Sequence, residues 1–158
     1  MANVLVVDHM HDVADSFAEV VTLFGHDVRI AHGAADTLRE IEQGQPDVVL
    51  VDIDMPVADG FLLARRIREK CGPSIRLVAH TAHPRETVAA NVTEAGFDSL
   101  VSKSARPLDL AVALSGCRRG PNLRSFDQRD RRKSARFTSP LRRSSDSMSG
   151  RESQSASG

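Results

Sequence analysis

Short apolar runs, repeated along the first two thirds of the chain, constrain its fold more than any other feature. The runs at residues 4–7 (VLVV) and 47–52 (DVVLVD) are almost unbroken, and further strand-like runs with more polar residues occur at 27–31, 75–80 and 99–102. Continuous Val-rich runs of this length are typical of strands buried on both faces of a parallel sheet. The sequence therefore predicts five parallel strands.

Amphipathic segments separate these runs. Apolar residues recur at helical spacing over 13–24, 34–41 and 62–71, and each of these segments is followed by a glycine. Pro84 and Pro107 mark the starts of two more helices, because proline is well tolerated in a first helical turn. Five strand–helix units in succession predict an α/β fold with a doubly wound sheet and helices on both faces.

The net charge of zero hides an asymmetry along the 158 residues. Residues 1–117 carry 10 Lys/Arg and 17 Asp/Glu, a balance of 10 − 17 = −7, and residues 118–158 carry 11 and 4, a balance of 11 − 4 = +7. The second segment is rich in Arg and Ser and has almost no apolar periodicity, so we expect a basic, disordered tail after one folded domain.

The basic tail raises the question of nucleic-acid binding. Clustered arginines can neutralise phosphates, but the tail offers only Phe126 and Phe137 as aromatic residues and no helix-turn-helix pattern. A solvated extension is the favoured interpretation and nucleic acid is not an expected partner, while a tail-driven DNA or RNA association stays open as a third hypothesis. We expect no separate effector domain.

Several features indicate a cytoplasmic protein. No apolar run approaches the roughly 20 residues that span a bilayer, and the chain does not open with a basic-then-apolar leader. Cys71 and Cys117 form neither a disulfide framework nor a metal-binding spacing, which favours free thiols in a reducing compartment. A membrane is not an expected partner.

Polar residues follow the predicted strands at the points where the strands end. They are Asp8, Asp52 with Asp54 close by, Thr81 and Lys103. In a parallel sheet these side chains meet at one edge, the edge where ligands bind in such folds. Carboxylates suit Mg²⁺, a hydroxyl and an ammonium can hold phosphoryl oxygens, and an aspartate can accept a phosphoryl group.

At this point the sequence resembles a known family. The segments VLVVD, PDVVLVDIDMPVADGF, VAHTA and EAGFDSLVSK are similar to the receiver domains of two-component response regulators, over residues 3–115. The resemblance implies a flavodoxin-like fold, (βα)5, with strand order 2-1-3-4-5. The domain would cover residues 1–117, with the tail over 118–158.

The resemblance also implies a function. A receiver takes a phosphoryl group from a histidine kinase or histidine phosphotransfer protein and passes the signal to a protein target. The face used is the one built by the fourth helix, fifth strand and fifth helix. Such a protein is not a conventional enzyme, since it catalyses at most the phosphorylation and dephosphorylation of its own aspartate. A homodimer stays open.

Residue by residue, the resemblance assigns roles. Asp52 matches the phosphoacceptor, Thr81 the hydroxyl that closes on the phosphoryl group, and Lys103 the lysine that pairs with it. Asp8 and Asp52 match metal-binding carboxylates, and Asp54 stands where a backbone carbonyl reaches the Mg²⁺.

Three positions depart from the family pattern. His9 replaces a second acidic residue that binds the metal directly, Leu100 replaces an aromatic switch residue, and Ser104 replaces a proline. Imidazole suits Mg²⁺ less well than carboxylate does, so we expect weakened Mg²⁺ affinity and slower phosphorylation. Either the carboxylate of Asp54 or a change to Mn²⁺ offers compensation. The alternative function is a receiver-like interaction module that works without phosphorylation.

The histidines near the site have competing interpretations. For His9, a solvent-facing side chain without a ligand role is favoured over a metal ligand. Strand alternation turns His80 away from the site and against a helix. His83 either overhangs the site or is an ordinary surface residue.

Overall fold

Five parallel strands form one sheet in the order β2-β1-β3-β4-β5. The computed structural model describes residues 1–56 and 59–115. The strands are β1 (Asn3–Val7), β2 (Asp27–Ala31), β3 (Val48–Asp52), β4 (Arg76–Thr81) and β5 (Ser99–Ser102). The predicted flavodoxin-like fold and strand order are therefore confirmed. The expected disordered tail, with Cys117, lies outside the described residues.

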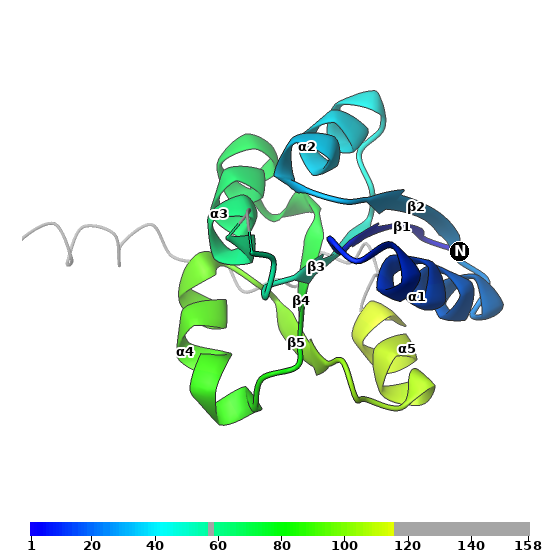
Figure 1. Cartoon of the computed structure of the whole chain (residues 1–158). Coiled ribbons are helices and arrows are strands. Elements are labelled where there is room, and N and C mark those ends of the chain that lie inside the picture. Colours follow the sequence, from blue (N-terminus) through cyan, green and yellow to red (C-terminus); the bar gives the residue numbers. More distant parts are fainter. Residues whose placement is uncertain (57–58, 116–158) are drawn as a thin grey trace, which may run out of the picture. The chain divides into compact units, whose positions relative to one another are not determined.

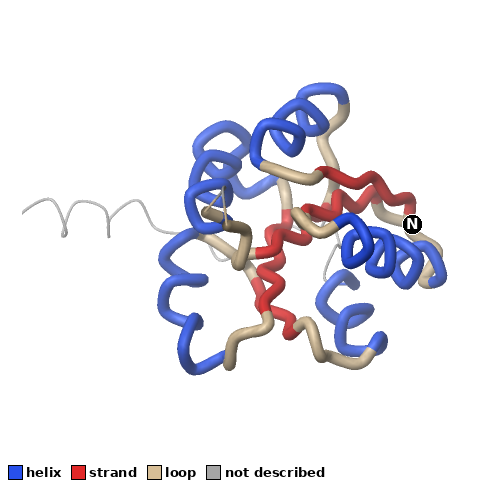
Figure 2. The backbone as a smooth tube through the Cα atoms, in the orientation of Figure 1, coloured by secondary structure: helices blue, strands red, loops and turns tan. Residues whose placement is uncertain are grey.

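The helices cover both faces of this sheet (Figure 1). They are α1 (His11–Leu23), α2 (Ala34–Gln43), α3 (Gly60–Cys71), α4 (Arg85–Ala95) and α5 (Pro107–Ser115), with a short 3₁₀ turn η1 (Gly72–Ser74) after α3. Figure 2 shows the strands as one inner layer with helices to either side. Among the described residues, no helix has both the length and the apolar character needed to cross a membrane.

Strand alternation divides the core into two clusters. Val4, Val6 and Leu50 pack with Val21 of α1 and Leu114 of α5 on one face of the sheet. On the other face, strand residues of opposite parity such as Leu5 and Val49 pack with Leu63 and Ile67 of α3 and Val92 of α4. Both faces of β1 and β3 are thus covered, which explains why these two segments read as unbroken apolar runs.

The start of α3 lies against the end of β3. Asp59 caps the helix by accepting a hydrogen bond from the Phe61 backbone N–H at 2.9 Å. A Cβ at Gly60 would stand 2.7 Å from both the Asp52 carbonyl oxygen and the Ile53 Cα. Only glycine permits this approach without displacement, so the sequence pair at 59–60 fixes how close the helix comes to the end of β3.

Arg68 of α3 ties the connection that follows α3 to the connection between α4 and β5. Its guanidinium donates to the carbonyl oxygens of Gly72 (3.0 Å), Ile75 (2.6 Å) and Gly96 (2.8 Å), and to Asp98 Oδ2 (2.6 Å). The first two carbonyls follow α3, and the last two partners lie between α4 and β5. A planar group with five donors suits this arrangement of separate acceptors.

Candidate functional site

The carboxyl ends of β1, β3, β4 and β5 bring the predicted residues together. Asp8 follows β1, Asp52 ends β3, Thr81 ends β4 and Lys103 follows β5. The side chains of Asp8, Asp52 and Thr81 are all buried. Parallel pairing in register places these ends at one edge of the sheet, since Asp52 lies opposite His80, the residue before Thr81.

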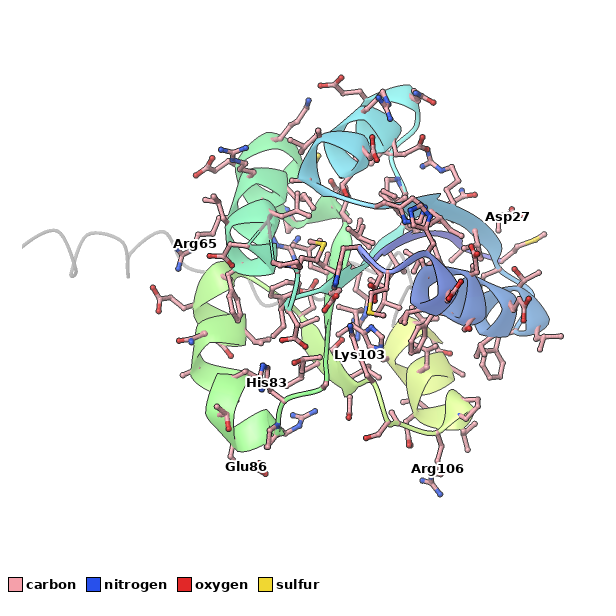
Figure 3. The ribbon with its side chains drawn as sticks, viewed as in Figure 1. Asp27, Arg65, His83, Glu86, Lys103 and Arg106 are labelled. Carbon is pink, nitrogen blue, oxygen red and sulfur yellow. The ribbon has the colours of Figure 1, made fainter. Side chains whose placement is uncertain are left out.

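Lys103 pairs with both buried carboxylates. Its Nζ lies 3.0 Å from Asp52 Oδ2 and 3.3 Å from Asp8 Oδ2. Burial acts to lower the pKa of the Lys103 ammonium, but the hydrogen bond to Asp52 and the negative charges of Asp52 and Asp8 outweigh it, so that the pKa rises above 10.5. Lys103 therefore carries a permanent positive charge at the phosphoacceptor candidate. Figure 3 labels this lysine near the centre of the view.

Backbone groups hold the two carboxylates in place. Asp8 Oδ1 accepts from the Met10 N–H and Asp52 Oδ1 from the Asp54 N–H, each at 2.9 Å. The Lys103 N–H donates to the Thr81 carbonyl at 2.7 Å, which ties the lysine to the end of β4. The first two hydrogen bonds limit rotation of the carboxylates and the third fixes the backbone that carries Lys103, so the edge presents a fixed arrangement.

His9 differs from the expectation that it faces solvent. Its Nδ1 lies 3.2 Å from Asp52 Oδ2 and 3.6 Å from Asp8 Oδ1, although the side chain is 35% exposed. The physical reason is the charge of two buried carboxylates, which attracts a ring N–H. Asp8, His9 and Asp52 each offer a ligand atom, and these atoms lie within 4.8 Å of one another.

This donor set fits a divalent cation. Asp8 Oδ2 is buried, and within the described part of the chain its one polar neighbour is the Lys103 ammonium at 3.3 Å, with no hydrogen-bond partner besides. The oxygen therefore keeps lone pairs that can serve a metal. The carboxylates suit Mg²⁺, whereas the His9 imidazole suits Mn²⁺ and other borderline ions better. The use of the Asp54 backbone carbonyl as a ligand remains a prediction.

The carboxylate of Asp54 has a different environment. It accepts hydrogen bonds from the Thr81 hydroxyl and from the Ala82 N–H, and His83 Nε2 lies 3.3 Å away. Its side chain thus turns toward β4 and does not join the cluster of Asp8, His9 and Asp52. The sequence did not predict that the Ala82 N–H is a donor at this site, because almost every residue type has the same backbone N–H.

His80 occupies the layer beneath the site, as strand alternation predicts. It is 2% exposed, and its ring meets Phe17 of α1 edge-on, with ring centroids 4.1 Å apart. Nε2 has no hydrogen-bond partner among the described residues. Burial lowers the pKa of this imidazole to about 4, and the positive charge of Lys103 acts in the same direction. His80 is therefore neutral near pH 7 and serves as a packing residue.

Known proteins are similar to this chain in sequence and in fold. The family model of the response regulator receiver domain matches residues 4–115. A 14.6 kDa protein of Leptolyngbya boryana, described only as uncharacterized, is 32% identical over 109 residues, which cover 68% of this chain and 83% of that protein. The DNA-binding transcriptional regulator NtrC of Proteus hauseri is 33% identical over 114 residues, which cover 72% of this chain but 23% of that protein.

Solved structures agree on the fold. A LuxR-family two-component response regulator from Aurantimonas sp. SI85-9A1 superposes with a TM-score of 0.68 at 27% identity, over 73% of this chain and 84% of that one. The chemotaxis protein CheY4 of Vibrio cholerae superposes with a TM-score of 0.70, over 75% of this chain and 99% of that one. Its 21% identity supports the fold alone.

Proposed function

Because this chain belongs to the response regulator receiver domain family, we propose that it is a phosphorylation-dependent switch of a two-component system. Asp52 accepts the phosphoryl group from a histidine kinase or a histidine phosphotransfer protein. One observation carries the proposal: the buried Asp52 carboxylate lies 3.0 Å from the Lys103 ammonium, at the sheet edge where Asp8 follows β1 and Thr81 ends β4. We propose that the protein is located in the cytoplasm, because that is where we expect it to meet the phosphoryl donor.

The proposed transfer exchanges one bond for another. A carboxylate oxygen of Asp52 attacks phosphorus, an O–P bond forms, and the N–P bond of the donor phosphohistidine breaks with its electron pair on the imidazole nitrogen. Lys103 is held beside the attacked carboxylate and carries the charge that stabilises the phosphoryl oxygens. The chain thus promotes phosphorylation of its own aspartate without being a conventional enzyme.

Asp8 and Asp52, with the Asp54 carbonyl, are the residues proposed to hold Mg²⁺. Bound there, the cation would offset the negative charge that gathers when a phosphoryl group meets two carboxylates. His9 supplies an imidazole nitrogen where a third oxygen is expected, 3.2 Å from Asp52 Oδ2. We therefore propose weak Mg²⁺ binding and tolerance of Mn²⁺.

The proposed output is a contact with a protein target at the α4–β5–α5 face. A hollow of about 560 Å³ lies there, lined in part by Thr81, Leu100 and Val112. Leu108 and Val112 of α5 are 64% and 67% exposed. Exposed apolar groups beside a hollow that reaches the site residue Thr81 are suited to a partner that senses the state of the site. A second copy of this chain is the other partner that this face could bind.

Phosphorylation of the full chain tests the proposal. We expect acetyl phosphate with Mg²⁺ or Mn²⁺ to add one phosphoryl group by intact mass, with the acid-stable, alkali-labile behaviour of an acyl phosphate. The label should be absent from Asp52→Asn. Mass detection is needed because the chain has no Trp or Tyr to report by fluorescence. Absence of label from wild type at high concentrations of both metals would reject the switch.

That outcome would favour the second candidate, a receiver-like interaction module that works without phosphorylation. The observation behind it is His9, whose ring occupies the space beside Asp52 and Asp8. The variant His9→Asp separates the two functions, since it should lower the Mg²⁺ concentration for half-maximal labelling by about ten- to a hundredfold, the size of effects seen around metal sites. Identical Mg²⁺ curves for variant and wild type would show that His9 does not limit metal binding.

A further inference from the structure

Three successive residues, from Thr81 at the end of β4 to His83, lie against the carboxylate of Asp54, and two of them donate hydrogen bonds to it. The Thr81 hydroxyl lies 2.9 Å from Asp54 Oδ2 and 3.1 Å from Oδ1, and the Ala82 N–H donates to Oδ2 at 3.0 Å. His83 Nε2 lies 3.3 Å from Oδ1 (Figure 3 labels this histidine). Asp54 is 23% exposed at its side chain, so the contact is partly shielded from water and the hydrogen bonds gain strength.

The direction of the Thr81 hydroxyl is fixed. Its oxygen accepts the His83 backbone N–H at 3.0 Å, and its proton points to Asp54. A hydroxyl has one proton to donate, and so has the Ala82 amide. While both donate to Asp54, neither can donate to another oxygen anion at the same place.

These donors stand next to the phosphoacceptor. The Asp54 N–H donates to Asp52 Oδ1 at 2.9 Å, and β3 and β4 are adjacent strands with Asp52 opposite His80. A phosphoryl group on Asp52 would carry oxygens toward the end of β4, where the Thr81 hydroxyl and Ala82 amide are the donors that face the site. The carboxylate of Asp54 has the charge and the oxygen spacing to accept hydrogen bonds from both donors before a phosphoryl group arrives.

We propose that Asp54 is an internal anion that occupies the phosphoryl-binding donors of β4 in the unphosphorylated protein. Phosphorylation of Asp52 then exchanges the Asp54 carboxylate for phosphoryl oxygens at Thr81 and Ala82. The consequence is twofold: Thr81 is held toward the site before any phosphoryl group arrives, and each phosphorylation must displace a bound carboxylate. This inference rests on the proposed phosphorylation of Asp52.

Two substitutions at Asp54 test the exchange. Asp54→Ala removes the acceptor, whereas Asp54→Asn keeps one acceptor oxygen and removes the charge; both keep the backbone carbonyl assigned to the metal. Asp59→Asn is the matched control, because it neutralises an exposed carboxylate in the same β3–α3 connection and asparagine still caps α3. Labelling by acetyl phosphate should be about tenfold faster in Asp54→Ala, the effect of removing one charged competitor. Asp54→Asn should fall between, and Asp59→Asn should match wild type.

A second measurement follows the contact itself. In amide NMR spectra of the unphosphorylated protein, the Ala82 proton should move strongly upfield in Asp54→Ala, since its acceptor changes from carboxylate to water. On phosphorylation it should move little in wild type, because one oxygen anion replaces another, and far in Asp54→Ala.

The outcomes separate the two proposals. Equal labelling rates in wild type and Asp54→Ala, or an Ala82 proton that Asp54→Ala leaves in place, would overturn the internal anion while leaving the switch intact. Absence of label from every protein, Asp54→Ala included, would overturn the switch and the exchange together.

Discussion

Burial of His80 makes the stability of the domain depend on pH. The imidazole is 2% exposed, and its pKa falls from 6.5 to about 4 in the native protein. Once the chain unfolds, the pKa returns to its ordinary value, so over this interval the unfolded state binds a proton that the native state rejects. The free energy of unfolding should therefore be highest at neutral and alkaline pH and should fall as the pH drops from 6.5 toward 4.

Proton linkage gives the magnitude. At pH 5 the unequal protonation of the two states lowers the free energy of unfolding by about 2 kcal/mol relative to alkaline pH, whereas at pH 7 the effect is well under ~1 kcal/mol. Acidification from pH 7 to pH 5 should therefore lower the free energy of unfolding through His80 by about 2 kcal/mol, a large part of the stability of a small domain.

The variant His80→Leu isolates this share. Urea unfolding followed by far-UV circular dichroism at pH 7 and pH 5 gives the free energy of unfolding for variant and wild type. From pH 7 to pH 5 wild type should lose about 2 kcal/mol more of its free energy of unfolding than the variant loses. His26→Gln, at a partly exposed position, should follow wild type. If His80→Leu and wild type lost stability in parallel on acidification, the burial argument would be refuted.

Two further predictions concern stability at pH 7. Gly60→Ala should lower the free energy of unfolding by about 1–3 kcal/mol, the usual cost of overpacking, because the new carbon meets the backbone of β3. Gly33→Ala, where no atom lies within 4 Å of the added carbon, should cost less, and equal losses would contradict the steric explanation. Arg68→Ala should cost about 2–4 kcal/mol because four acceptors lose their donor. Arg65 lies in the same helix as Arg68 but makes an exposed ion pair with Glu94 of α4, so Arg65→Ala should cost about 0.5 kcal/mol. Similar urea midpoints for the two arginine variants would argue against the role of Arg68.

The fold and the members of the site were predictable from the sequence for one physical reason. Burial on both faces leaves unbroken apolar runs, and polar residues at the ends of such runs have one common edge to occupy. Asp52, Thr81 and Lys103 follow from that pattern. The direction in which a residue points does not follow from the pattern. Asp54 can present either its backbone carbonyl or its side-chain carboxylate to the site, and the sequence is the same in both cases.

The direction of the His9 side chain could not be predicted from the sequence either. Its residue type indicates a polar group at the surface, and more than a third of the side chain is indeed exposed. The ring nevertheless turns inward, because the buried charges of Asp8 and Asp52 come from distant parts of the chain and act only after the sheet has formed. The contact of Arg68 with four acceptors is equally non-local, since η1 and the α4–β5 connection carry no pattern that points to it.

The position of β1 within the sheet bears on how the protein is made. The first strand of the chain is an interior strand, with β2 on one side and β3 on the other. Both of its neighbours have left the ribosome once residue Asp52 has emerged, while β4 and β5 add afterwards to one free edge, in the order of synthesis. A nascent chain can therefore assemble its sheet outward from a finished three-stranded nucleus, without opening any pairing that it has already made.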